Sequence, residues 1–297
     1  MTNVNNIKII SAFLSMVNLF LLVGGSTCFA ETEVENKKPL WEVGLFNSAM
    51  TFPHYLGSDE QMYYFLPLPY FIYRGEKIRA DQDGVDGIFW KSDHIESSLS
   101  LSGYPPVLGD TEAREGMPDL GTIFGIGPEL KFYLNNRKAI NPVYFSAAVQ
   151  GVSSIDSGLS MAFEGVRYSV NLIYQNKTSI QKKGSSFGVN AGVYYADSGL
   201  HGYFYDVDPV YARVDRPIYK SERGHSGHSV YGYLIYGLTD ILSLGFFGRW
   251  DNVKHAVFND SPLVKQNDTY MGGISLIWKI YESKKLVVVD SSTNHKL

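Results

Sequence analysis

Hydrophobic and polar residues alternate along most of this chain. Between Val166 and Gln175 the sequence reads VRYSVNLIYQ, in which the even positions are apolar or aromatic and the odd positions are polar apart from Ile173. Successive side chains of a β-strand point to opposite faces, so this pattern predicts a strand with one apolar and one mostly polar face. The same alternation recurs in TIFGIGPELKFYL (122–134), FGVNAGVYY (187–195) and LSLGFFGRW (242–250).

The pattern predicts ten clear strands and two weaker ones, near Ile78–Trp90 and Tyr203–Arg213. No stretch shows a helical period. Segments of about ten alternating residues separated by turns are typical of transmembrane barrels, although a soluble β-sandwich alternates too. Two details favour the barrel. The polar faces carry Gly, Ser and Asn beside single charges, and the apolar faces carry aromatic residues near strand ends, such as Trp41, Tyr174, Tyr195 and Trp250. We therefore expect an antiparallel barrel of about twelve strands, with ten as the alternative.

The first thirty residues have the features of a secretory signal peptide. Lys8 precedes an apolar run from Ile9 to Val23, and small residues stand three and one positions before a predicted cut between Ala30 and Glu31. An uncleaved membrane anchor is the alternative. The prediction is a signal peptide over 1–30 and a single barrel domain over 31–297. Cys28 is the only cysteine, so the predicted mature chain has none and holds neither a disulfide nor a cysteine metal site.

Composition narrows the possible class of protein further. Lys8 is the only charged residue of the predicted signal, so 25 of the 26 basic residues face 30 acidic ones in the mature chain, a net charge of −5. This balance argues against a nucleic-acid partner, which requires a basic surface. The chain is rich in Tyr (21), Phe (17) and Gly (29), which suits a barrel better than a secreted soluble enzyme.

The twelve-strand register also predicts which connections share an end. With both termini in the periplasm, Leu238–Ile241 becomes a periplasmic turn, and Asp251–Asp268 and Asn176–Ser185 become outer loops. Tyr104–Gly121 then falls on the periplasmic side. Its segment AREGMPDL is a candidate docking loop for a periplasmic partner through Arg114, Glu115 and Asp119, and the alternative is a loop held by a local Arg–carboxylate contact.

Other clusters carry weaker signals. DQDGVDG (81–87) spaces three carboxylates but lacks a complete calcium-loop pattern, so a solvated turn is the better interpretation. The aromatic segment 201–219 suits an interfacial belt with a polar lumen network better than a sugar site. His225 and His228 in GHSGHS have no evident third metal ligand, and a mobile outer loop is expected there. We predict no catalytic residues, no metal and no cofactor.

The last predicted strand, YMGGISLIWKIY (270–281), has the glycine-then-aromatic ending of a closing barrel strand. Such a strand usually ends the protein. Here the sixteen residues 282–297 follow it, as a tail without an assigned role.

Several segments in the same order resemble one family. They are HYLGSDEQMYYFLPLPYFIYRGEKIRADQDGVDG (54–87), AREGMPDLGTIFGIGPEL (113–130), YYADSGLHGYFYDVDPVYARVDRPIY (194–219), FNDSPLV (258–264) and MGGISLIW (271–278). Together they resemble the MipA/OmpV family, whose MipA members are called MltA-interacting proteins. The resemblance spans nearly the whole predicted mature chain.

The resemblance implies a non-enzymatic barrel in the outer membrane of a Gram-negative bacterium, in contact with lipid and lipopolysaccharide. It further implies a scaffold that joins a lytic murein transglycosylase to a bifunctional murein synthase in peptidoglycan assembly. The alternatives are a narrow channel for small solutes and an outer-membrane adhesin. The family supplies no catalytic residues.

Overall fold

A computed structural model describes residues 37–74, 79–81, 84–85, 89–107, 111–137, 139, 141–156, 158–176 and 185–288. The predicted signal, its cleavage site between Ala30 and Glu31, and most of the DQDGVDG turn lie outside the described residues. Within them the fold is almost entirely antiparallel sheet, as the alternation predicted.

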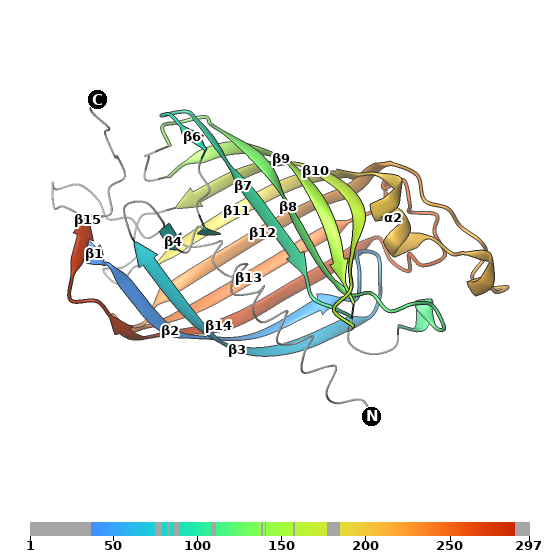
Figure 1. Cartoon of the computed structure of the whole chain (residues 1–297), viewed down its shortest axis with the longest axis horizontal. Helices are drawn as coiled ribbons and strands as arrows, with labels where there is room; N and C mark the ends of the chain where they lie inside the picture. The colour runs from blue at the N-terminus through green and yellow to red at the C-terminus, as the bar shows by residue number, and fades with distance from the viewer. Residues whose placement is uncertain are drawn as a thin grey trace.

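Ten long strands of 10 to 16 residues dominate the described chain (Figure 1). They are β2 (Trp41–Pro53), β3 (Gln61–Arg74), β7 (Ile95–Tyr104), β8 (Thr122–Tyr133), β9 (Val143–Ile155), β10 (Met161–Asn176), β11 (Ser186–Ala196), β12 (Gly224–Gly237), β13 (Leu242–Asn252) and β14 (Asp268–Glu282). Apart from β3 and β7, long strands that are neighbours along the chain pair with each other, and β14, the last long strand, pairs with β2, the first. The sheet is therefore an up-and-down meander.

A closed ring of these ten strands would need ten pairs of neighbouring strands. In the described part of the chain nine of these pairs are joined by hydrogen-bonded ladders, and the tenth, between β3 and β7, is not. Between these two strands lie the short strands β4 (Arg79–Asp81), β5 (Gly84–Val85) and β6 (Trp90–Lys91), which end the sheet order on either side. Pro67 and Pro69 of β3 lack the N–H that a central strand donates, which suits an edge.

The two edges of the sheet nevertheless approach each other (Figure 1). The hydroxyl of Tyr104, at the end of β7, donates to the carbonyl of Pro53, and the ring of Tyr104 contacts that of Phe52 with centroids 6.0 Å apart. The hydroxyl of Tyr64 on β3 donates to the carbonyl of Pro106 at 2.7 Å. Side chains from opposite ends of the strand order meet in this way only if the sheet curls around on itself.

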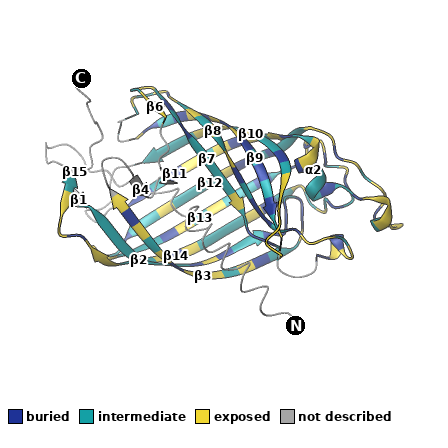
Figure 2. Cartoon of the chain, in the orientation of Figure 1, coloured by how far each residue is buried: buried dark blue, intermediate teal, exposed yellow. Residues whose placement is uncertain are grey.

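On most of the long strands the burial is the reverse of that in a soluble protein (Figure 2), whereas β2 and β3 bury an apolar cluster of Met50, Leu66 and Leu68. Along β10 the apolar residues Tyr168, Val170 and Leu172 are 48, 55 and 42 % exposed. On the opposite face of the sheet, serines and other polar residues are buried, including Ser98, Ser146, Gln150, Ser229 and Ser275. We call the polar face the interior face. The two faces predicted from the alternation are thus present, with the apolar one outward.

At Gly127, the lack of a side chain lets two neighbouring strands pack closely. A Cβ atom on Gly127 of β8 would lie 1.9 Å from the carbonyl oxygen of Val149 on β9, so no larger residue fits there without a shift of the backbone. Gly165 has φ +149°, which only glycine adopts readily, and it stands at a register shift between β9 and β10. The shift marks a β-bulge or a similar irregularity near the start of β10.

Two predicted strands are wrong or reduced. The segment Tyr203–Arg213 holds the end of helix α2 (Ser198–Tyr205) and the 3₁₀ turn η2 (Pro209–Tyr211), because Asp197 caps the helix and Pro209 begins the turn. The described residues of the segment Ile78–Trp90 form β4, β5 and the start of β6. No helix of the described chain is long and apolar enough to cross a membrane.

Loss of the strand at Tyr203–Arg213 changes the placement of two connections. Because the long strands alternate in direction, the connections after β2, β7, β9, β11 and β13 share one end of the sheet. Tyr104–Gly121 therefore lies at the same end as Asp251–Asp268, not at the opposite end as the twelve-strand register predicted. Asn176–Ser185 connects strands at the end of the turn Leu238–Ile241, so its predicted place beside Asp251–Asp268 was also wrong.

Part of the C-terminal tail belongs to a small second sheet. Strand β15 (Leu286–Val288) pairs antiparallel with β1 (Lys37–Pro39), directly beyond the β2–β14 ladder. The amide of Leu40 donates to the carbonyl of Lys285 at 2.8 Å, which joins this ribbon to the ladder. Both described ends of the chain therefore lie together, at the end of the sheet that carries Leu238–Ile241. We call this the terminal end.

Candidate functional site

The opposite end of the sheet is covered by packed connections, which we call the cap: residues 54–60, 105–107, 111–121, 197–223 and 253–267 (Figure 1). Its centre is an apolar cluster in which the rings of Tyr205 and Phe258 stack with centroids 3.7 Å apart. The other buried members of the cluster come from every long segment of the cap and are Tyr55, Leu120, Val207, Val253, Ala256 and Leu263. The cap is thus a folded unit rather than a set of separate loops.

Tyrosine hydroxyls fix the cap segments to one another. Tyr55 donates to the carbonyl of Leu263 at 2.7 Å, and Tyr205 donates to the carbonyl of Leu56 at 2.9 Å. Burial raises the pKa of both hydroxyls well above the ordinary value, so they remain protonated donors. Each bond satisfies a carbonyl that would otherwise be buried without a partner.

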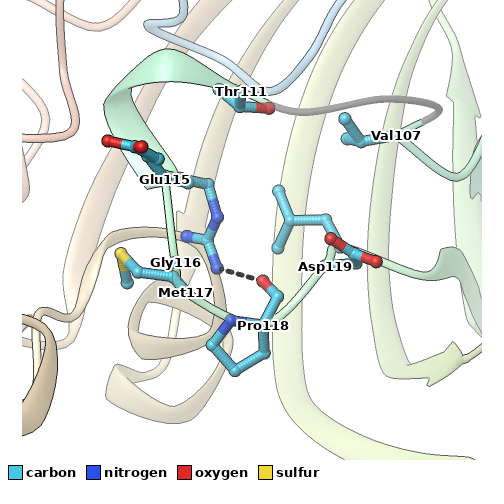
Figure 3. Close-up of a pocket in the computed structure, with 9 residues that line it drawn as sticks. Val107, Thr111, Glu115, Gly116, Met117, Pro118 and Asp119 are labelled. Carbon is cyan, nitrogen blue, oxygen red and sulfur yellow. Dashed lines mark hydrogen bonds between the residues drawn. The ribbon is translucent and has the colours of Figure 1, made fainter.

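Arg114 of the predicted docking loop lies inside the cap. It stands at the end of the 3₁₀ turn η1 (Glu112–Arg114), and its guanidinium donates to the carbonyl of Phe204 at 2.8 Å. It also donates to the carbonyl of Pro118 at 3.2 Å, the bond drawn as a dashed line in Figure 3. Burial lowers the pKa of this guanidinium. Arg114 also lines a small cavity of about 160 Å³ between Thr111 and Leu120. Its contacts hold the loop to α2, so a structural role is established for it.

Glu115 and Asp119 point away from each other (Figure 3). Glu115 is exposed and pairs with Arg213, 2.6 Å away on the connection after α2, which lowers the pKa of the Glu115 carboxylate. Arg216 binds the main-chain carbonyls of Ala113 and Glu115 at 3.1 and 3.0 Å. Glu115 thus pairs with an arginine of another connection and Arg114 binds main-chain carbonyls, so the local Arg–carboxylate contact considered from the sequence is not found among the described residues. All three candidate residues line the cavity, although Glu115 and Asp119 point apart, and their docking role stays a prediction.

Two buried histidines also hold cap segments. Nδ1 of His201 lies 2.7 Å from the carbonyl oxygen of Glu222, so it carries the proton, and Nε2 accepts from Ser226 at 2.7 Å. Nδ1 of His54 lies 2.7 Å from the hydroxyl of Thr111. Burial lowers the pKa of both rings, which favours the neutral form. Sequence reasoning missed both, because an isolated histidine carries no signal of burial.

The aromatic segment 201–219 was misread as a membrane belt. Tyr205 and Val207 are buried in the cap cluster, and the hydroxyl oxygen of Tyr203 accepts a hydrogen bond from the amide of Gly121 at 2.8 Å. His225 and His228 are also misplaced by the prediction of a mobile loop, since both lie on β12. Among the described residues no three His, Cys, Asp or Glu side chains are grouped to hold a metal ion.

The interior face carries charged groups near the terminal end. Lys131 lies 3.2 Å from Glu96 and 3.7 Å from Glu129, and Arg137 lies 3.8 Å from Glu96. Ser98 and Ser146 also donate to Glu129. Two cations thus face two carboxylates, and the network is electrically balanced.

Fold and site together define a class: an antiparallel meander with an apolar outer face, a polar interior face and a folded cap over one end. Residues 43–280 match the model of a protein family described as MltA-interacting protein MipA, and the chain belongs to this family. The resemblance predicted from the sequence is thereby confirmed. None of the curated proteins compared with the chain matches it.

Proposed function

We propose that the protein is a closed ten-stranded barrel in the outer membrane of a Gram-negative bacterium. The observation that carries this proposal is the inverted burial of the sheet, with exposed apolar side chains outside and buried polar ones inside. Contacts of Tyr104 and Tyr64 across the β3–β7 gap support closure. The outer face would lie in lipid and lipopolysaccharide. In water the same face would promote aggregation.

The terminal end faces the periplasm in this proposal. Outer-membrane barrels have short periplasmic turns and longer extracellular loops. The four-residue turn Leu238–Ile241 lies at the terminal end, whereas the connection 197–223 lies in the cap. In this orientation the cap, with Arg114, Glu115 and Asp119, faces outward. The docking prediction for these residues then holds for a periplasmic enzyme only if the orientation is reversed.

Within the membrane the protein acts as a non-enzymatic scaffold for murein enzymes, a lytic transglycosylase and a bifunctional synthase. The family description, which names interaction with MltA, supports the first partner. In the proposed orientation the partner surface is the terminal end, where the β1–β15 ribbon and the turns 134–142 and 238–241 lie. A fixed surface of this kind brings two enzymes together at the membrane.

Cross-linking from the two ends tests both orientation and scaffolding. A photo-reactive residue replaces Thr239 at the terminal end or Arg213 in the cap, and captured proteins are identified by mass spectrometry. Murein enzymes captured through position 239 and not through 213 support the proposal. Capture through position 213 alone would show that the cap faces the periplasm, and it would support the docking role predicted for the loop of Arg114, Glu115 and Asp119. Capture of no murein enzyme at either position contradicts the scaffold.

An adhesin is the second candidate, and one observation favours it. The connection 209–218 projects from the cap and exposes three apolar side chains, Val210, Val214 and Ile218. Exposed apolar clusters of this kind mark contact surfaces. Replacement of all three by serine would reduce adhesion of whole cells to a host surface if the adhesin function is real, and would leave it unchanged if the protein acts only as a scaffold.

The folded cap argues against the third candidate, a channel. Its buried cluster covers one end of the interior. Single-channel recordings in planar bilayers should therefore show small conductance or none. A steady open conductance would instead support the channel function.

A further inference from the structure

Arg167 is a cation on the interior face without a matching carboxylate. It lies on β10, and its Nε and Nη2 atoms donate to Oε1 of Gln150 at 3.2 and 2.5 Å. In the described part of the chain no carboxylate lies within 4.0 Å of its guanidinium. Its side chain is partly exposed, so it remains accessible to solvent from within the interior.

The neighbouring strands build this arrangement specifically. Gln150 stands directly opposite Arg167 in the β9–β10 register. Its amide crosses β8 to reach β7, where Ser102 donates to Oε1 and Nε2 donates to Ser100, both at 3.0 Å. Gly125 of β8 leaves room for this crossing, since a Cβ there would lie 2.5 Å from the hydroxyl of Ser102.

One neutral oxygen therefore receives three donor groups, while the guanidinium keeps donors to spare. Arginine has five N–H groups in a planar fork, and Gln150 takes two of them. A partly desolvated guanidinium with only a neutral partner is costly, because no opposite charge compensates the hydration that it has lost. An oxyanion in the interior would supply that charge.

The other interior cations differ from Arg167 in this respect. Arg249 is held by Asp251 through several bonds, the shortest 2.6 Å, and Lys131 faces Glu96 and Glu129. Arg249 also lies over the ring of Tyr194, 5.5 Å from its centroid. The group Arg167, Arg249 and Asp251 carries two positive charges and one negative charge. The excess positive charge is therefore localised at Arg167.

We propose that Arg167 is an oxyanion-binding residue inside the barrel, for a small solute that bears a carboxylate or a phosphate. The planar guanidinium matches either group through paired hydrogen bonds. Gln150 acts as a positioning residue that holds the guanidinium in place and leaves its remaining donors free. This inference goes beyond the scaffold function and does not depend on any protein partner.

Calorimetric titration of the full mature chain in detergent micelles, with acetate and with inorganic phosphate at low ionic strength, tests the site. Saturable binding of either anion is expected, and the anion that binds identifies the class of solute. Arg167→Gln should weaken this binding at least tenfold. Arg213→Gln removes the same charge from the cap and should leave it unchanged.

A second variant distinguishes loss of the anion site from loss of folding. Gln150→Glu places a carboxylate against Arg167, so it should abolish anion binding while the thermal midpoint of unfolding stays level or rises. Absence of saturable binding by both anions, or equal binding by wild type and Arg167→Gln, would overturn the proposal. Cross-linking of murein enzymes is read separately, so failure of the anion site leaves the scaffold proposal standing.

Discussion

At the scale of single residues, Tyr205 combines ring packing and a hydrogen bond in the centre of the cap. It is buried, stacks on Phe258 and donates to the carbonyl of Leu56. Tyr205→Ala should therefore cost about 3–5 kcal/mol of local cap stability, by analogy with other buried aromatic truncations. Hydrogen exchange of the amides of residues 253–264 measures this. Tyr270→Ala, at an exposed aromatic ring outside the cap, is the control, and equal protection in both variants would contradict the packing described.

His201 makes the cap sensitive to acid. Because burial lowers its folded pKa below the ordinary value of 6.5, the opened cap binds a proton that the folded cap excludes. The stabilisation is complete above about pH 6.5 and declines as pH falls toward the folded pKa, by at most about 1.4 kcal/mol per pH unit. Asp197 acts against this effect by raising the pKa.

Cap opening measured by hydrogen exchange between pH 7.5 and 5, after correction for intrinsic exchange, checks the sign. His201→Gln should flatten the profile, leaving the part due to His54, whereas His255→Gln on the exposed surface should not. A profile that is flat in the wild type, or that shows greater stability at low pH, would refute this account of the histidines.

The contacts of individual cap residues could not be predicted from the sequence. Arg114 and Glu115 were predicted to dock a partner, which stays a prediction; the contacts that they make in the structure are with Phe204 and Arg213, 90 and 98 residues away. No spacing rule brings such segments together. Arg167 was predicted on a polar strand face, yet its lack of a carboxylate became visible only when Gln150 was placed opposite it.

At the scale of elements, helix α2 depends on one carboxylate. Asp197 accepts from the amide of Leu200 at 2.9 Å as the N-cap and from the amide of Val166 at 2.8 Å. Asp197→Ala removes both bonds and should lower cap stability by about 1–2 kcal/mol. Asp197→Asn keeps one acceptor oxygen and should lie between. Denaturant unfolding followed by near-ultraviolet circular dichroism compares the three, and an unchanged midpoint in Asp197→Ala would show that the cap does not rest on α2.

The long strands were predictable because alternation is a local property of the sequence, and residues such as Val170 and Ser169 reveal their faces without knowledge of any neighbour. The segment Tyr203–Arg213 was wrongly predicted to be a strand for the same reason. Its aromatic residues suit a strand locally, but the Asp197 cap and Pro209 direct the chain into a helix and a turn. Burial of Tyr205 in a tertiary cluster then stabilises that choice.

At the scale of the whole molecule, one misassigned strand reversed the placement of the connections between β7 and β11. Tyr104–Gly121 and Asn176–Ser185 exchanged ends, while Leu238–Ile241 and Asp251–Asp268, which follow the segment, kept their relative places. The pairing of Leu286–Val288 with Lys37–Pro39 joins opposite ends of the chain and has no local signature. Family membership could be predicted, because ordered motifs survive such errors of topology.

The central claim is that the apolar face of this sheet meets lipid and the polar face encloses an interior. Spin labels on single cysteines at positions 168 to 173 of β10 test it directly in liposomes, since the predicted mature chain has no cysteine of its own. Labels at 168, 170 and 172 should be accessible to oxygen dissolved in the bilayer, and labels at 169, 171 and 173 should not, which gives a period of two. Equal accessibility at all six positions, or exposure of the even positions to a water-soluble relaxant, would contradict the account.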